Sequence, residues 1–180
     1  MIDVRRIHQL LAQAPQPPGE ALPGGISDSE CDAFEQRTGI RLPDEVRQWL
    51  KVSNGPCVGP GGLYGIRPQR SHLDIETFLE MFPSWRTRKW IPVAGDGCGN
   101  YYVIPTQAEY GSGYPVLFVD TNSTSDTPSF IVASNIGHFL VSLLEKELGR
   151  EGWPFNESYV TKADPEITRF VGVSLPWTAE

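Results

Sequence analysis

The sequence predicts a single-domain α+β fold, and three observations lead to that prediction. The chain has 180 residues, the usual size of one domain. Helical patterns come first, strand-like runs mixed with helices follow, and a helix closes the core. This order lacks the regular strand–helix alternation of doubly wound α/β proteins. With 39% hydrophobic and 21% charged residues, the chain has the composition of a globular domain that needs no disulfide or metal to fold.

The first helix is predicted over residues 2–14, where apolar side chains recur at helical spacing until Pro15 stops the pattern. Residues 15–25 are rich in proline and glycine and are interpreted as a linker loop.

A pair of helices is predicted over residues 27–55. Ser27, with Glu30 three residues on, has the pattern of a capping box, and Gly39 is typical of a helix C-terminus. Pro43 is expected at the first position of the second helix of the pair.

The second half of the chain contains most of the strand-like runs. A helix is expected over residues 74–82, and Ser134 is expected to cap the closing helix. Two of the runs flank the glycine-rich segment 95–100 and therefore predict a hairpin. The expected strands cover residues 63–66, 90–94, 101–104, 116–120 and 130–133.

Residues 150–180 are too rich in apolar and aromatic side chains for a free tail. We expect this C-terminal extension to pack back on a domain formed by residues 1–149 or to form a partner surface.

The charge pattern indicates which classes of partner the chain can bind. The net charge is −7 and no basic stripe is present, so nucleic acid is not expected as a partner and a basic protein is. The one short basic run, Arg86, Arg88 and Lys89, is interpreted as a solvated connection between a helix and a strand.

The three cysteines, Cys31, Cys57 and Cys98, predict neither a disulfide framework nor a zinc site, because they are few and lack paired spacing. Residues 1–11 lack the apolar run of a signal peptide, and no stretch has the length of a membrane span. We therefore expect a cytoplasmic protein without a membrane partner.

Several short motifs occur in a fixed order, and together they resemble the SUKH superfamily, the Smi/Knr-type domains named after a fungal cell-wall assembly regulator. The similarity covers roughly residues 20–148. The motifs are GIS at 25–27, GIRLPDE at 39–45, LKVSNG at 50–55, GLYGI at 62–66, WIPVAGDG at 90–97, GNYY at 99–102 and PVLFVD at 115–120.

The resemblance implies a mainly antiparallel central sheet flanked by helices. It also implies a binding protein rather than an enzyme, because bacterial members are widely immunity proteins. Such proteins neutralise cognate toxin domains, often nucleases, of polymorphic toxin systems. A regulatory scaffold of the cell-wall-regulator type is the alternative that the fungal relatives imply.

The segment 95–100 has two interpretations. Successive backbone N–H groups of a glycine turn could form an anion nest, which would make the chain an anion- or small-molecule-binding module. Alternatively, the segment is a structural hairpin turn in which Asp96 and Asn100 bond the local backbone. A dinucleotide site is not indicated, because the residues after the turn are typical of a strand.

Candidate partner-binding residues are the aromatic and polar side chains around this hairpin. Exposed tyrosine and tryptophan give large contact areas at interfaces, although core packing is the alternative for each ring. Adjacent tyrosines of one strand face opposite sides of the sheet, so one of the pair 101–102 is expected to be exposed or half-buried. The candidates are Tyr64, Trp85, Trp90, Asp96, Asn100, Tyr101, Tyr102 and Asp120.

No constellation of catalytic residues emerges from the sequence. The histidines His8, His72 and His138 fall in separate elements. A thiol–imidazole pair of Cys57 or Cys98 with His72 has no support from spacing, and Asp96 with Asp120 is better interpreted as two solvated turn carboxylates. We expect no catalytic residue, no bound metal and no cofactor.

Overall fold

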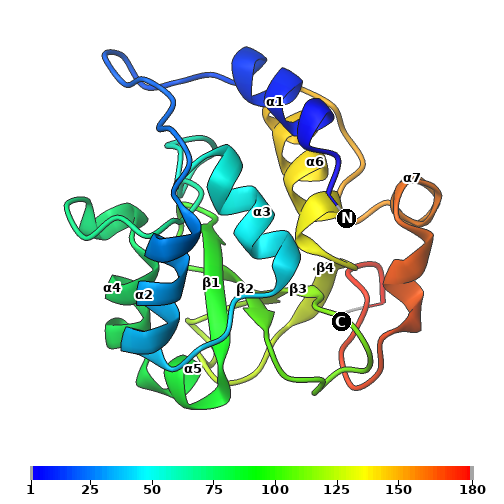
Figure 1. Cartoon of the computed structure of the whole chain (residues 1–180). Helices are drawn as coiled ribbons and strands as arrows, with labels where there is room; N and C mark the ends of the chain where they lie inside the picture. Colours follow the sequence, from blue (N-terminus) through cyan, green and yellow to red (C-terminus); the bar gives the residue numbers. More distant parts are fainter. Residues whose placement is uncertain (1, 179–180) are drawn as a thin grey trace.

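A four-stranded antiparallel sheet forms the centre of the computed structural model, which describes residues 2–178 (Figure 1). Each strand pairs with the next one along the chain, in the order β1-β2-β3-β4. The predicted α+β class with an antiparallel sheet is confirmed. The strands are β1 (Trp90–Gly95), β2 (Tyr101–Pro105), β3 (Val116–Val119) and β4 (Phe130–Ala133).

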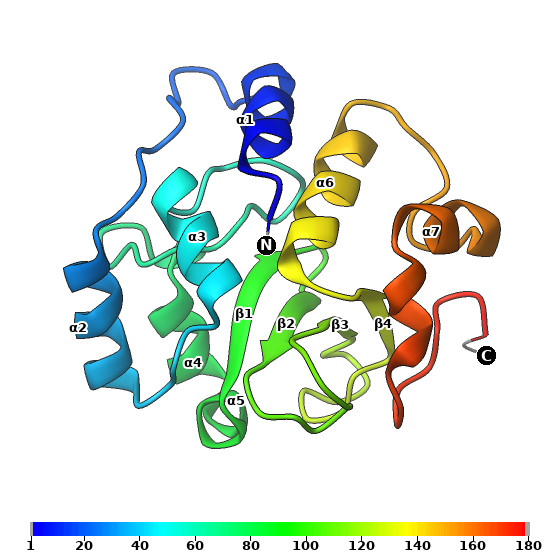
Figure 2. The same ribbon diagram turned by 45° about the vertical axis from the view of Figure 1, so that its right-hand side comes forward.

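Helices pack around this sheet. Two short helices, α4 and α5, lie against β1, whereas α6 packs with α1 and α3 (Figures 1 and 2). The C-terminal α7 and η2 lie beside β4 (Figure 2). The helices are α1 (Val4–Gln13), α2 (Asp28–Thr38), α3 (Asp44–Val52), α4 (Ile75–Met81), α5 (Pro83–Arg88), α6 (Ile136–Glu147), α7 (Glu157–Ala163) and the 3-10 turns η1 (Ser71–Leu73) and η2 (Pro165–Arg169).

Two tyrosines of β2 show how the two faces of the sheet are covered. Tyr101 is half-buried and Tyr102 is buried, and the two rings point to opposite faces as adjacent strand residues must. Around Tyr101 lie rings carried by α4, α5 and the preceding segments: Tyr64, Phe78, Phe82 and Trp85. Around Tyr102 lie rings from β3, α6 and the C-terminal extension: Phe118, Phe139 and Trp153.

The predicted helix signals of the α2–α3 pair are largely confirmed. Ser27 and Glu30 form the reciprocal capping box, and Gly39 ends α2 with a φ of 66°. Pro43 differs by one position, because it is the N-cap and Asp44 is the first helical residue.

The closing helix starts one residue later than expected. The N-cap of α6 is Asn135, whose side chain accepts a hydrogen bond from the His138 N–H at 3.0 Å. The Ser134 hydroxyl lies 3.2 Å from the Asn135 side-chain amide, and its backbone N–H donates to the Asp164 carboxylate of the C-terminal extension at 2.6 Å. Serine and asparagine are both favoured at N-caps, so the local sequence does not decide between these two neighbours.

Two further expectations are corrected. Residues 63–66 form no strand, only isolated bridges of Leu63 with Ala94 and of Gly65 with Asp74. Arg86 and Arg88, expected in a solvated connection, instead lie in the helix α5, which begins at Pro83 because proline is already suited to a first helical turn.

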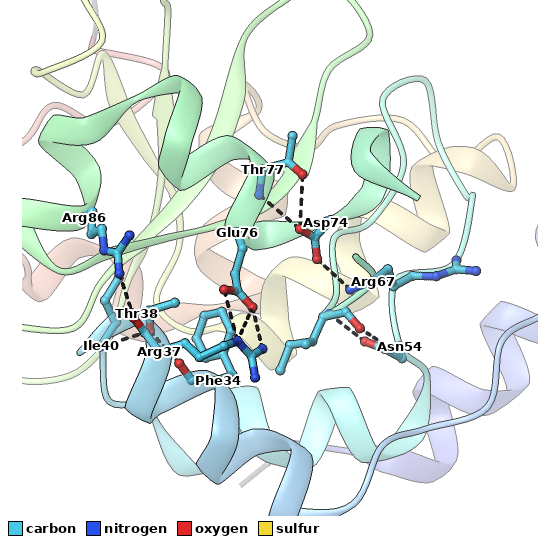
Figure 3. A network of polar contacts seen from close by, with 11 residues as sticks. Phe34, Arg37, Thr38, Ile40, Asn54, Arg67, Asp74, Glu76, Thr77 and Arg86 are labelled. Carbon is cyan, nitrogen blue, oxygen red and sulfur yellow. Dashed lines mark hydrogen bonds and ion pairs between the residues drawn. The ribbon is translucent and has the colours of Figure 1, made fainter. Parts of the chain in front are cut away.

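Buried Asp74 organises a polar network between α4 and the segment before it (Figure 3). Its carboxylate accepts hydrogen bonds from the Arg67 N–H at 2.6 Å and the Thr77 N–H at 3.0 Å. Nearby, the Asn54 side chain bonds both backbone groups of Ile66 at 2.8 and 2.9 Å. These contacts fasten the turn after α3 to the start of α4.

Carboxylates of α2 and α4 are paired with cations on the same side of the molecule. Arg47 of α3 lies 2.6 Å from Asp32 and 3.0 Å from Glu35. Arg37 contacts Glu76 of α4 at 2.5 Å (Figure 3). We call Asp28, Asp32, Glu35, Asp74 and Glu76, with their partners, the helix-side network; Asp28 belongs to it through Lys51 at 2.6 Å.

The C-terminal extension is anchored on the face of the sheet that carries Tyr102. The buried Trp153 indole donates to the carbonyl of Val132 in β4 at 2.9 Å. The N–H of Ile131 donates to the Ser174 carbonyl at 2.9 Å, so the extension also occupies part of the β4 edge. Residues 179–180 of the extension lie outside the described residues.

Candidate protein-binding surface

The β1–β2 hairpin turn is held closed by the carboxylate of Asp96. One carboxylate oxygen accepts from the backbone N–H groups of Cys98 and Asn100 at 2.7 and 3.0 Å, and the other accepts from the Asn100 amide at 2.8 Å. Gly97 and Gly99 supply positive φ angles of 79° and 92°. The structural interpretation of the turn therefore accounts for its residues. Two of the N–H donors that an anion nest in this turn would use, those of Cys98 and Asn100, are already bonded to Asp96 and are not free for an external anion.

A second turn after β3 has the same design and lies against the first. The carboxylate of Asp120 accepts from the Asn122 N–H at 2.9 Å and from the Ser123 hydroxyl at 3.1 Å. Of these hydrogen bonds, the one from the Asn122 backbone contributes most to holding the pKa of Asp120 below its ordinary value. The Thr121 hydroxyl donates to the Gly99 carbonyl at 2.6 Å, so the two turns form one continuous surface.

The loop between α3 and η1 supports this surface from the side. At Gly61 and Gly95 the two backbones approach so closely that a Cβ on Gly61 would lie 2.4 Å from the Gly95 carbonyl carbon. The same loop reaches Glu147 at the end of α6 through Gly59. Its Gly-rich sequence is explained by this close approach.

This loop also relates the carboxylates of Glu147 and Asp96 to each other. Gly59 lies against the Glu147 side chain, and Gly61 lies against Gly95, the residue before Asp96. The two carboxylates are therefore on the same side of the sheet end. Burial raises the pKa of the Tyr102 phenol to about 12, and both carboxylates add to that shift. We call Asp96, Asp120 and Glu147 the acidic end of the sheet. None of the three forms an ion pair within residues 2–178.

Four of the predicted aromatic contact residues are core residues instead. Tyr64, Trp85, Trp90 and Tyr102 have exposed fractions between 0 and 7%. Two of them have their indole N–H groups satisfied internally: Trp85 donates to the Ser125 carbonyl at 2.6 Å and Trp90 to Glu109 at 2.8 Å. Core packing explains these four rings, because large apolar surfaces gain most from burial between the sheet and its helices.

The remaining predicted candidates stay at the surface. Asp96, Asn100, Asp120 and Tyr101 are all partly exposed, and the first three lie in the paired turns. Tyr101 is enclosed by aromatic neighbours on most sides, so it offers little more than one edge.

The basic run before β1 has internal partners. Arg86 donates to the Arg37 carbonyl at 2.6 Å, and Arg88 pairs with Glu109 at 2.6 Å while its guanidinium lies 3.8 Å above the Trp90 ring. Lys89 ends α5 in the left-handed conformation. The run thus fixes α5 to its surroundings, and Arg88 is paired with a carboxylate.

The thiol and imidazole groups are not assembled into a site. Over residues 2–178, no hydrogen bond joins Cys57 or Cys98 to His72, and no group of three His, Cys, Asp or Glu side chains is arranged to hold a metal ion. Over the same residues, no helix combines the length and apolarity that crossing a bilayer requires.

A family model places the chain among known proteins. The model described as SMI1 / KNR4 family (SUKH-1) matches residues 25–142, more than half of the 180 residues. The chain belongs to the SMI1/KNR4 (SUKH-1) family. The resemblance in the ordered motifs is thereby confirmed. A search of the curated proteins finds no match to this SUKH-1 protein.

The match leaves α7, η2 and the rest of the C-terminal extension outside the SUKH-1 region. This part of the chain supplies an exposed ring that is not among the predicted contact residues, Phe155, which is 62% exposed. Phe155 contacts Phe130, which in turn stacks on Phe118. The sequence places Phe118 and Phe130 in strand-like runs, which could have indicated that the two rings are neighbours. The contact of Phe155 with them depends on tertiary structure and has no signal in the sequence.

Proposed function

We propose that this SUKH-1 protein is an immunity-type protein, which binds a cognate bacterial toxin domain and neutralises it by protein–protein contact. Family membership supports a binding role in general. The observation that carries the proposal is the acidic end, where the joined turns of Asp96 and Asp120 and the loop beside Glu147 bring three carboxylates together without cationic partners in the described chain. Such a surface complements a basic partner and accelerates its association.

A nuclease toxin fits this surface, because an enzyme that captures a phosphate backbone carries a basic binding face. An acidic inhibitor that covers this face excludes the nucleic-acid substrate. The overall charge of −7 adds to the attraction.

The test is co-expression with the toxin encoded beside the gene for this chain. We expect restored growth and a complex of nanomolar affinity that weakens as salt rises. Glu147→Lys should slow association, whereas Glu80→Lys, the same charge change on exposed Glu80 of α4, should leave it nearly unchanged. Growth arrest despite co-expression, with no detectable complex, would contradict the proposal. Capture of host proteins alone from native cells would favour the regulatory scaffold.

A further inference from the structure

We infer that Phe155 of the C-terminal extension, with Phe130 and Phe118, is the apolar anchor by which this protein holds a basic protein partner. The inference rests on the proposed function and names the surface that the partner contacts. We call these three rings the aromatic patch.

The aromatic patch is a row of rings that runs from the core to solvent. Phe118 and Phe130 stack at a centroid distance of 4.9 Å, and Phe155 meets Phe130 edge-on at 5.8 Å. Phe118 and Phe130 are half-buried, and Phe155 is 62% exposed. At its inner end, Phe118 contacts Tyr102 at 5.4 Å. Solvent-facing rings that rest on a packed base are typical of interface hot spots.

Phe155 is presented on a rigid piece of chain. Trp153, two residues before it, is buried and bonded to β4. Asn156, the next residue, caps α7 by accepting from the Tyr159 N–H at 2.9 Å, and its own N–H donates to the Gly152 carbonyl at 2.7 Å. Because both flanking residues are fixed, an interface at Phe155 loses little conformational entropy on binding.

Carboxylates near the aromatic patch favour a basic partner. Glu151 and Glu157 flank Phe155, are exposed, and form no ion pair in the part of the chain that the structure describes. Asp120 of the acidic end follows Phe118 by two residues. A second copy of this acidic chain or an anionic membrane would place like charges against these carboxylates. A basic protein with an apolar pocket matches both the rings and their acidic rim.

The aromatic patch combines residues of the family domain with a residue of the C-terminal extension. Two of its rings lie on strands inside the SUKH-1 match, and the most exposed ring lies outside it. The extension therefore adds a partner-specific contact to a family core. The edge of the sheet that it covers at Ile131 is closed to strand addition, so the partner binds through side chains at this point.

The test measures affinity for the co-expressed toxin with variants of the full chain. We expect Phe155→Ala to weaken binding by about 30-fold or more, the level of a hot spot, with a melting temperature close to that of the wild type. The matched control is Val171→Ala, because Val171 is an equally exposed apolar residue of the extension, 66% exposed, whose backbone N–H is bonded to Tyr110 and not to a strand that carries the aromatic patch. Glu157→Gln should reduce the salt dependence of association, and Glu80→Gln should not.

The outcomes separate this inference from the proposed function. Wild-type affinity in Phe155→Ala, with toxin neutralisation intact, would overturn the aromatic patch and leave the immunity function standing. Equal losses in Phe155→Ala and Val171→Ala would also overturn it, because the effect would not be specific to the aromatic patch. A wild-type chain that neither binds nor neutralises the toxin would overturn both.

Discussion

The helix-side network and the acidic end use carboxylates in opposite ways. Around α2, α3 and α4, carboxylates are matched to cations, as Asp32 and Glu35 are to Arg47, or are buried with backbone N–H donors, as Asp74 is. At the acidic end, Asp96 and Asp120 are partly exposed and bond their own turns through neutral donors, so their negative charge is not cancelled. The first arrangement holds helices together, and the second leaves an electrostatic field directed at solvent. Charge alone does not mark a binding surface; charge that is exposed and has no internal cation does.

Aromatic residues show the same division. Trp85 and Trp90 are fully buried and have bonded indole groups, whereas Phe155 carries most of its ring in water. The buried rings hold helix and strand together, and the exposed ring is free to contact a partner.

The largest effect is expected from Asp74→Ala, which tests whether the helix-side network stabilises the fold. It removes the side-chain cap of α4 and leaves the Arg67 N–H without its acceptor. We expect a loss of about 2–4 kcal/mol in the free energy of unfolding, from the cap and the unpaired donor together. Urea unfolding measures it. Asp74→Asn, which keeps the shape and one acceptor, should lose less, and equal losses would show that the hydrogen bonds are not the cause.

Gly61→Ala tests the support of the acidic end. Its new Cβ would meet the Gly95 backbone, and backbone cannot move aside as a side chain can. We expect a loss of about 1–3 kcal/mol in thermal or urea unfolding. Gly24→Ala is the matched control, because a Cβ there meets nothing within 4 Å. A Gly61→Ala protein as stable as the control would show that the two loops do not depend on this approach.

The smallest expected effect is a pH dependence of the stability of the turn at Asp120. Its pKa lies below the ordinary aspartate value, so the turn's stabilisation is fully present above that value and is lost as the pH falls through the lowered pKa. In an NMR titration, the amide signal of Asn122 should move with a midpoint below that of aspartate in a short peptide. A midpoint at or above the peptide value would mean that the hydrogen bonds do not favour the ionised carboxylate.

Local chemistry predicted much of the fold. The capping box at Ser27, the left-handed Gly39 and the hairpin at residues 95–100 each depend on a few neighbouring residues, and the structure contains all three. Predictions that depended on distant partners were less successful. Asn135 caps the closing helix in place of Ser134, which is buried with its N–H bonded to Asp164, thirty residues away in sequence.

The candidate surface was predictable only in part. Turn residues such as Asp96 and Asn100 must stay near solvent, because hairpin turns cross the surface. The burial of an aromatic side chain on a strand or helix depends on which other element packs over it. Here α5 packs over β1, and the C-terminal extension brings Phe155 to Phe130. Periodicity gives no information on which elements cover a ring, so the sequence alone does not separate a buried ring such as Trp85 from an exposed one such as Phe155.

Hydrogen–deuterium exchange of the chain with and without its toxin tests the central claim most directly. The account predicts that binding slows exchange at residues 96–100, 118–130 and 151–157, and leaves residues 28–54 of the α2–α3 pair unchanged. Protection over α2 and α3, with none at the acidic end or around Phe155, would contradict it.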